Sequence, residues 1–279
     1  MNEANPGTLY VVSTPIGNLE DITLRALRVL REAHVVAAED TRHTRKLLSH
    51  FDIHTPMVSF HEHSPEHQRA RLLDRLLAGA SVALVSDAGT PGVSDPGYPL
   101  VFDAVAAGVP VVPIPGASAA LSALVASGLP TDRFRFVGFL PRKLSDRRAE
   151  LSRLAADRDT LIILEAPHRI QKTLTELAEA FGPRAACAAR ELTKVHEEFI
   201  RGPLTEMLER LPDPILGEWT LVIGGSEPLE EASDEADWLE DLSRRLAAGE
   251  STRDAARAVS ETHRIPRKQA YEAAVNLKP

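Results

Sequence analysis

The chain has 279 residues, of which 43% are hydrophobic, and a formal net charge of −8. This length allows about two domains, each large enough to bury its own core. The single cysteine, Cys187, excludes an internal disulfide and fits a reducing compartment, so we expect a cytoplasmic protein. Residues 1–7 do not resemble a signal peptide. Prolines interrupt the uncharged stretch 104–131, so we expect no membrane span.

Charge is distributed unevenly along the chain. Residues 206–241 hold twelve acids and one base, a net charge of −11. Residues 133–148 carry a net charge of +5, and residues 242–279 carry +4. Basic stretches of this kind favour a polyanionic partner, although solvated helix faces would give the same pattern.

Strand and helix patterns alternate from the N-terminus. Short apolar runs predict strands at 8–12, 34–38, 57–60, 81–85 and 109–114. Helical spacing of apolar residues predicts helices at 23–31, 64–78, 98–107 and 117–126, with Ser64 as the cap of the second and Pro65 at its first position. This alternation is typical of parallel β-α-β units, so residues 1–127 are predicted to form an N-terminal α/β domain.

A second α/β domain is predicted at 128–226. Its expected strands, which we predict to form a mixed sheet, are 134–139, 160–164, 185–190, 197–200 and 220–223. The acidic stretch 227–237 is typical of a linker. The rest of the tail is predicted to be helical, with a capping box at Ser251 and Asp254 and a further helix opened by Pro266. The third part of the chain is therefore 227–279.

The segment from Ser86 to Gly97 is the most informative loop. It follows a buried strand and holds three glycines, two prolines and two aspartates. Glycines allow close approach of the backbone to a ligand, and prolines make a loop rigid. The loop has no lysine and lacks phosphate-loop spacing, so a small polar, cationic ligand is the expected occupant. No G-x-G-x-x-G dinucleotide fingerprint occurs in the chain.

Other strand ends allow two readings. The carboxylates of Glu39 and Asp40 beside Arg42 could hold or deprotonate a substrate hydroxyl, or they could stabilise a helix N-terminus capped by Thr41. The segment from Gly116 to Ala120 resembles a nucleophile elbow but lacks its last glycine, which disfavours a hydrolase. The histidines follow no metal-binding spacing, so no metal site is expected.

Several of these segments together resemble one family. The segments are 10–23, 38–44, 86–97, 113–116 and 189–194. They resemble the tetrapyrrole methylase superfamily and, within it, the ribosomal RNA small-subunit methyltransferase I branch. The likeness runs in order over about residues 7–225, and the basic helical tail also fits it.

The resemblance implies a fold, a cofactor and a reaction. The fold would be two α/β domains of the tetrapyrrole-methylase type with a ligand cleft between them, usually dimeric, plus a small helical C-terminal unit. S-adenosylmethionine would bind in the cleft, and the enzyme would methylate the ribose 2′-oxygen of a cytidine at the decoding site of small-subunit rRNA. The implied cofactor contacts are Pro15, Ile16, Asp87, Thr90, Ser118, Ala119, Leu164 and Thr220.

Chemistry at strand ends suggests further roles. Asp40 or Glu191 could act as the general base for the ribose hydroxyl, with Lys194 or Arg42 holding a nearby phosphate. The expected RNA contacts are Arg42, Arg45, Lys46, Arg142, Lys143, Arg147 and Arg148. The partner would be small-subunit rRNA or the assembled small ribosomal subunit. Two alternatives stay open: a methylase of a tetrapyrrole carbon, and a non-catalytic RNA-binding module with the same fold.

Overall fold

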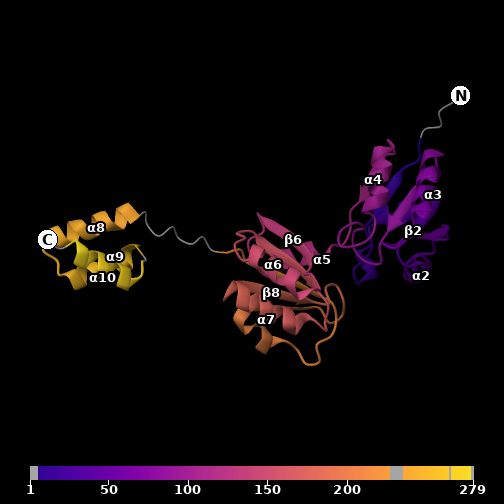
Figure 1. Cartoon of the computed structure of the whole chain (residues 1–279). Coiled ribbons are helices and arrows are strands. Elements are labelled where there is room, and N and C mark those ends of the chain that lie inside the picture. The colour runs from indigo at the N-terminus through magenta and orange to yellow at the C-terminus, as the bar shows by residue number, and fades with distance from the viewer. Residues whose placement is uncertain (1–5, 227–234, 264, 278–279) are drawn as a thin grey trace. The chain divides into compact units, whose positions relative to one another are not determined.

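A computed structural model describes residues 6–226, 235–263 and 265–277. The chain divides into two compact units, 1–225 and 226–279. The first unit contains two five-stranded sheets with helices between their strands, and the second contains three helices (Figure 1). In the part of the chain that the model covers, no helix combines the length and the apolar character needed to cross a membrane.

The first sheet is entirely parallel, in the order β3-β2-β4-β1-β5. Its strands are β1 (Leu9–Val12), β2 (Val35–Ala38), β3 (Met57–Ser59), β4 (Val82–Val85) and β5 (Val111–Ile114). The helices that connect them are α1 (Leu24–Glu32), α2 (Thr41–His50), α3 (Glu66–Leu77) and α4 (Tyr98–Ala106), and the short 3-10 helix η1 (Leu19–Asp21) precedes α1. The strands and helices predicted for this part are confirmed within a few residues at their ends.

Both faces of this sheet are buried, as is usual for parallel sheets. Alternate strand residues point to opposite faces. One face packs against α1 and α2 through a cluster that includes Val36, Leu30 and Leu48. The other face packs against α3 and α4 through a cluster that includes Val35, Leu76 and Leu100. The carboxyl ends of the strands are consequently the place where loops are free to form a site.

Two predicted helix caps differ from the structure. Asp40, not Thr41, caps α2, because the Asp40 carboxylate accepts a hydrogen bond from the Arg42 N–H at 2.7 Å. The cap of α3 is Pro65, and the Ser64 hydroxyl instead accepts the N–H of His61 at 2.8 Å. In both places a polar side chain accepts a hydrogen bond from a nearby backbone N–H. Residue type alone does not specify which N–H that is.

The second sheet is mixed, in the order β6-β7-β10-β8-β9. Strands β6 (Phe134–Phe139) and β7 (Thr160–Glu165) run parallel. Strands β8 (Ala185–Arg190), β9 (Glu198–Pro203) and β10 (Trp219–Ile223) complete it with antiparallel pairings. One face is covered by α6 (Leu144–Leu154), α7 (Ile170–Phe181) and the 3-10 segment η2 (Leu204–Arg210). The prediction of a mixed sheet is confirmed.

Helix α5 (Ala119–Ser127) links the two sheets. It follows β5 in the chain, yet its buried residues Ala123 and Leu124 pack against Ile162 and Val222 of the second sheet. Ile16, just after β1, joins the same cluster. The segment after β1 and the start of α5 are thereby held against the second sheet, although the sequence division placed both in residues 1–127.

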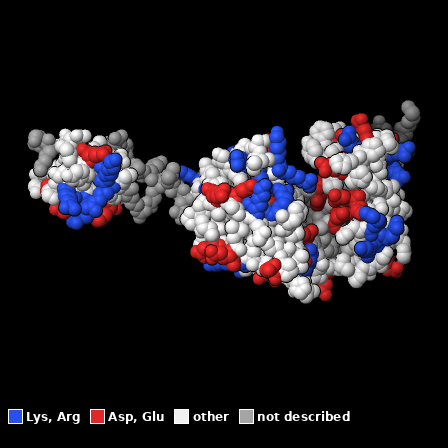
Figure 2. All heavy atoms as spheres, turned by 60° about the horizontal axis from the view of Figure 1, so that its bottom comes forward, with Lys and Arg blue, Asp and Glu red and all other residues white. Residues whose placement is uncertain are grey.

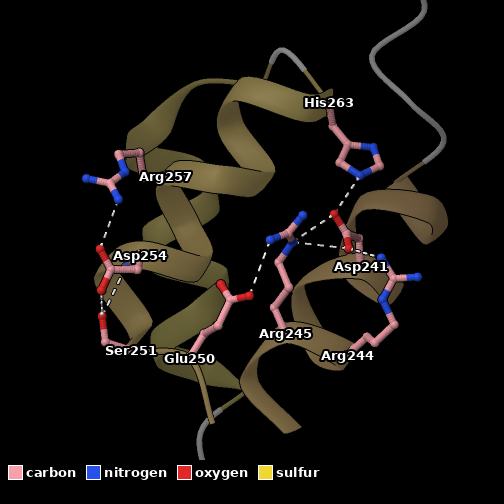
Figure 3. Close-up of polar contacts among 8 residues, drawn as sticks. All are labelled: Asp241, Arg244, Arg245, Glu250, Ser251, Asp254, Arg257 and His263. Atoms are coloured by element: carbon pink, nitrogen blue, oxygen red, sulfur yellow. Dashed lines mark hydrogen bonds and ion pairs between the residues drawn. The ribbon is translucent and has the colours of Figure 1, made fainter. Parts of the chain in front are cut away.

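The second unit is a three-helix bundle of α8 (Glu235–Ala247), α9 (Thr252–His263) and α10 (Arg267–Asn276). Its core includes Trp238, Leu242 and Val259. The predicted linker 227–237 falls mostly outside the described residues, and its last three residues belong to α8. The cap at Ser251 is confirmed, since its hydroxyl accepts the Asp254 N–H at 3.1 Å (Figure 3).

Candidate functional site

The loop after β4 folds back onto the loop after β1. Thr14 and Gly89 exchange two backbone hydrogen bonds, of 2.8 and 3.1 Å, in an isolated antiparallel bridge. The hydroxyls of Ser13 and Thr90 lie 2.8 Å apart. Gly89 has φ +74°, a conformation that favours glycine. Because β1 and β4 are neighbours in the sheet, these contacts place Thr90 beside the segment that carries Pro15 and Ile16.

Asp87 joins the loops after β2 and β4. Its carboxylate accepts the Asp40 N–H at 3.1 Å, and its own N–H donates to the Glu39 carboxylate at 3.3 Å. No ion pair to Asp87 occurs among the described residues. Its carboxylate is therefore free to receive a cationic or hydroxyl-bearing ligand.

The loop after β5 approaches the loop after β1 equally closely. A Cβ atom on Gly116 would lie 2.9 Å from the Ser13 Cβ, so only glycine fits there without movement. Two residues later, Ser118 caps α5 by accepting the Leu121 N–H at 3.4 Å. The expected cofactor contacts after β1, β4 and β5 are thus gathered at one edge of the first sheet. Leu164 and Thr220 are paired with each other in the second sheet.

Asp40 is fully engaged by its neighbour. Arg42 Nη2 lies 2.7 Å from Asp40 Oδ2, and Oδ1 accepts the Arg42 N–H and Nε–H. These hydrogen bonds hold the pKa of Asp40 well below its usual range. A carboxylate with such a low proton affinity is a weak general base. The structure therefore favours the helix-capping interpretation of Asp40 over the catalytic one.

Glu191 and Lys194 form a compact polar arm after β8. Lys194 Nζ lies 2.8 Å from Glu191 Oε1 and 3.0 Å from Glu218 Oε2, while the Glu218 N–H also donates to Glu191 Oε1 at 3.0 Å. Burial opposes ionisation of Glu191, but the hydrogen bonds from Lys194 and Glu218 outweigh it and lower its pKa. Burial likewise opposes the charge of Lys194, yet its carboxylate partners raise its pKa.

The backbone of this arm is strained. Glu191 has φ +51° and Thr193 has φ +67°, both in the left-handed region that non-glycine residues rarely adopt. Strain of this kind is concentrated at functional sites. The Glu191 side chain also fills the space beside Gly217, where a Cβ would lie 2.6 Å from Glu191 Oε1. The conformation of the arm is therefore fixed by its surroundings.

Sequence reasoning gave Asp95 no role of its own within the Ser86–Gly97 loop, whereas it proposed that Glu39 could hold or deprotonate a substrate hydroxyl. Burial and the nearby charges of Glu39 and Asp87 raise the pKa of Asp95 to about 6, against a hydrogen bond with Ser86 that lowers it. Burial also raises the pKa of Glu39, opposed by its hydrogen bond from the Asp87 backbone. Perturbed carboxyl groups are frequent at functional sites. The sequence signal for Asp95 was its position in a loop that follows a buried strand.

The basic residues expected to contact RNA divide into two kinds. Arg42, Arg45 and Lys46 on α2, and Arg142, Lys143 and Arg148 at α6, are exposed. Arg147 is 4% exposed and directed inward, where it forms ion pairs with Glu165 and Glu176 and donates to the Thr173 hydroxyl. Its guanidinium is already satisfied inside the protein, which corrects its expected role in RNA contact.

Charged side chains form several groups on the first unit. Figure 2 shows acidic groups at several places on the face in view, some of them next to basic groups. The acidic residues Glu39 and Glu62 border the cavity at the carboxyl ends of β2 and β3, whereas the basic residues of α2 are exposed to solvent. Groups of opposite charge favour ligands of opposite charge at different places on the surface.

Known proteins match this fold and most of the chain. The family model described as Tetrapyrrole (Corrin/Porphyrin) Methylases matches residues 8–208. Ribosomal RNA small subunit methyltransferase I of Halalkalibacterium halodurans is 47% identical and covers 95% of this chain and 93% of its own. The protein of that name in Synechocystis is 47% identical over 98% of this chain and 99% of its own.

The chain belongs to the ribosomal RNA small subunit methyltransferase I family of tetrapyrrole methylases. Among solved structures, uroporphyrin-III C-methyltransferase from Thermus thermophilus, complexed with S-adenyl homocysteine, is similar with a TM-score of 0.53. It is 24% identical and covers 77% of this chain and 97% of that one, which shows the shared fold. The fold expected for this family member, with two α/β sheets and a helical C-terminal unit, is confirmed.

Proposed function

We propose that this family member transfers a methyl group from S-adenosylmethionine to the ribose 2′-oxygen of a cytidine at the decoding site of small-subunit rRNA. The observation that carries the proposal is the identity of nearly half of all residues, over almost the full length, with relatives named ribosomal RNA small subunit methyltransferase I. The match extends through the tail, which a methylase of small tetrapyrroles does not require.

The donor site has the right chemistry for S-adenosylmethionine. The Asp87 carboxylate has no cationic partner among the described residues and suits an amino group or a ribose hydroxyl of the donor. Backbone groups near Pro15, Thr90 and Ser118 border the same strand ends, and Ile16 and Ala119 supply apolar surface. On the second sheet, Leu164 and Thr220 would complete the site. When bound, the cofactor supplies a sulfonium methyl group that is already activated.

The chain's own residues mainly orient the two reactants. Alignment of a nucleophile with an activated group is worth roughly 7–11 kcal/mol of barrier lowering. The ribose hydroxyl must lose its proton as its oxygen attacks, and we assign this role to Glu191. The pKa of both Glu191 and Asp40 is lowered, but Glu191 accepts its hydrogen bonds through Oε1 and leaves Oε2 without one within the described part of the chain, whereas both Asp40 oxygens are engaged. Lys194 would hold the adjoining phosphate.

The exposed bases Arg42, Arg45, Lys46, Arg142, Lys143 and Arg148 are proposed to bind the RNA backbone. Contacts of this kind release counterions, so affinity should fall steeply with salt. The partner is small-subunit rRNA or the assembled small ribosomal subunit, and the active enzyme is proposed to be a cytoplasmic homodimer.

Transfer of labelled methyl groups tests the proposal. The full chain is incubated with methyl-labelled S-adenosylmethionine and either free rRNA, small ribosomal subunits lacking the modification, or a porphyrinogen. We expect label on a single cytidine of the rRNA, resistant to alkali at the following phosphate because the 2′-oxygen is blocked. Label on the porphyrinogen alone would establish the tetrapyrrole alternative. Tight RNA binding without any transfer would establish the non-catalytic one.

A further inference from the structure

A cavity of about 510 Å³ lies at the carboxyl ends of β2, β3 and β4, beside the loops that are proposed to bind S-adenosylmethionine. Its volume lies within the roughly 300–1,000 Å³ typical of small-molecule sites. Glu39 contributes from the loop after β2, Phe60 and His61 from the segment after β3, and Asp95 and Tyr98 from the loop and helix after β4.

The cavity lies on the β2 and β3 side of the first sheet, next to the strand ends that carry the proposed cofactor contacts. The sheet order is β3-β2-β4-β1-β5, and the proposed donor contacts of this domain follow β1, β4 and β5. Asp87 lies at the boundary, because its carboxylate accepts the Asp40 N–H and its N–H donates to Glu39, which lines the cavity. In-line transfer requires the acceptor to lie directly beside the donor. This cavity is the adjoining space.

The lining excludes a phosphate and suits a ligand rich in N–H donors. The carboxyl groups of Glu39, Glu62 and Asp95 line it, and its one arginine, Arg69, is paired with Asp103 at 2.7 Å. Burial and the charges of Glu39 and Asp87 raise the pKa of Asp95 to about 6, so Asp95 takes up a proton more readily than an ordinary aspartate and can do so when a ligand presents an acceptor to it. The cavity can therefore offer a hydrogen-bond acceptor and a donor together.

Aromatic groups supply a second, independent feature. Phe60 is buried at 4% exposure in the wall, and the Tyr98 ring is 68% exposed at the rim. An exposed ring beside a cavity provides a surface on which a planar base can stack. Enzymes that act on a nucleobase take it out of its stack and read its Watson–Crick edge in such a pocket. The same mode of binding would fix the ribose that is attached to the base.

We propose that this cavity receives the acceptor nucleobase and that Glu39 and Asp95 recognise the amino group and ring nitrogen of a cytosine. This inference rests on the proposed function and adds the residues that select the nucleotide. A carboxylate accepts a hydrogen bond from the cytosine amino group, and a protonated carboxyl group donates one to the ring nitrogen. Uracil reverses both positions, since it presents a carbonyl oxygen and an N–H there. The carbonyl oxygen of uracil would be repelled by the Glu39 carboxylate, and its ring N–H by the O–H of protonated Asp95.

The proposal is tested by changing the carboxyl groups and the base together. Glu39→Gln and Asp95→Ala full-length variants are compared with wild type on small ribosomal subunits, or the rRNA, carrying either cytidine or uridine at the acceptor position, since asparagine at position 95 would still donate to the ring nitrogen. Glu32→Gln on α1 is the matched control, because its exposed carboxylate pairs only with Arg28 in the described structure and Glu32 precedes β2, whereas the cavity lies at the carboxyl end of that strand. Binding of S-adenosylhomocysteine is measured by calorimetry for every variant.

We expect wild type and Glu32→Gln to prefer cytidine strongly in kcat/KM. One well-formed pair of hydrogen bonds to a base gives about 5- to 150-fold discrimination, and each cavity variant should reduce the preference by a factor in that range. Affinity for S-adenosylhomocysteine should change far less than the base preference, since no proposed cofactor contact is replaced and a glutamine oxygen at position 39 can still accept the Asp87 N–H. An unchanged preference in both variants would overturn the inference. A loss of affinity for S-adenosylhomocysteine as large as the loss of base preference would also overturn it, because the cavity would then be part of the cofactor site.

A second measurement does not depend on the variants folding. The wild-type protein is mixed with RNA that carries a fluorescent cytosine analogue at the acceptor position, in the presence of S-adenosylhomocysteine. We expect an emission change when the base leaves its stack and enters the cavity, and none with the analogue two nucleotides away. Equal emission at both positions would contradict the inference. Failure of wild type to methylate any rRNA would instead refute the proposed function, so the two failures are distinguishable.

Discussion

The aliphatic chain of Lys194 lies against the backbone of Gly17, so that a Cβ on Gly17 would stand 2.5 Å from Lys194 Cγ and 2.8 Å from its Cε. Gly17 follows β1 of the first sheet, and Lys194 follows β8 of the second. The contact therefore joins the segment proposed to hold the donor to the arm proposed to hold the acceptor. Its geometry depends on the absence of a side chain at position 17.

Replacing Gly17 with alanine should displace Lys194 and slow methyl transfer. We expect a loss of about 10-fold or more in kcat/KM with a small change in stability, because misplacement of a group by about 1 Å can cost as much as 100-fold. The measurement is a double-mutant cycle with Lys194→Ala. Once the lysine side chain is removed, Gly17→Ala should have little further effect. Fully additive losses would show that the two residues act independently.

Substitution of the two candidate bases should give unequal results. Glu191→Gln is expected to lower the single-turnover rate by about 10²–10⁴-fold, the usual contribution of a general base. Asp40→Asn should change the rate by less than about 10-fold, since asparagine also caps helices well. Rapid-quench measurement with saturating cofactor separates chemistry from binding. A full rate for Glu191→Gln would exclude Glu191 as the base.

Asp95 should reduce stability above neutral pH. Its pKa of about 6 in the folded protein exceeds the ordinary value of 3.8, so the unfolded state ionises first as pH rises. Its unfavourable contribution therefore develops between about pH 4 and 6 and persists above. Asp95→Asn should raise the free energy of unfolding at pH 8 by on the order of 1 kcal/mol, after allowance for solvent screening, and by little at pH 4. Urea unfolding at both pH values, with exposed Asp132→Asn as control, measures this.

Arg147 and Arg148 are adjacent but should respond oppositely to alanine. Arg147→Ala leaves Glu165 and Glu176 without their buried partner and should cost roughly 3–5 kcal/mol of stability. Arg148→Ala should leave stability nearly unchanged. If Arg148 contacts phosphate, its loss should weaken RNA binding and reduce the slope of log affinity against log salt by about 1. Thermal unfolding and salt-dependent RNA titrations distinguish the two. Equal slopes for wild type and Arg148→Ala would show that Arg148 does not contact an RNA phosphate.

Asp241 is the polar centre of the C-terminal bundle. Its carboxylate accepts hydrogen bonds from Arg244, Arg245 and His263, which converge on it from α8 and α9 (Figure 3). Asp241→Ala should destabilise this unit by about 1–3 kcal/mol, since the partly buried side chains of Arg245 and His263 lose their acceptor. Limited proteolysis should then cleave the tail of the variant faster while residues 1–225 persist. Equal cleavage rates for variant and wild type would contradict this.

The sequence alone determined the order and type of most elements. The runs of Val35–Ala38 and Val82–Val85 predict buried strands because every residue is apolar, and turn residues mark their ends. It also identified the Ser86–Gly97 loop as a ligand site, because glycines and prolines specify local backbone shape. These properties depend on residues close in the chain, which is why they could be inferred without coordinates.

Only the tertiary structure decided which charged groups are available. Arg147 and Arg148 have the same local signal, yet one is buried against α7 and the other is exposed. Asp40 is neutralised by Arg42, while burial and the charge of Glu39, which lies 56 residues away in the chain, raise the pKa of Asp95. Burial and charge proximity are set by contacts between distant segments. The chemistry of the carboxyl groups at the edge of the first sheet is therefore a property of the folded chain.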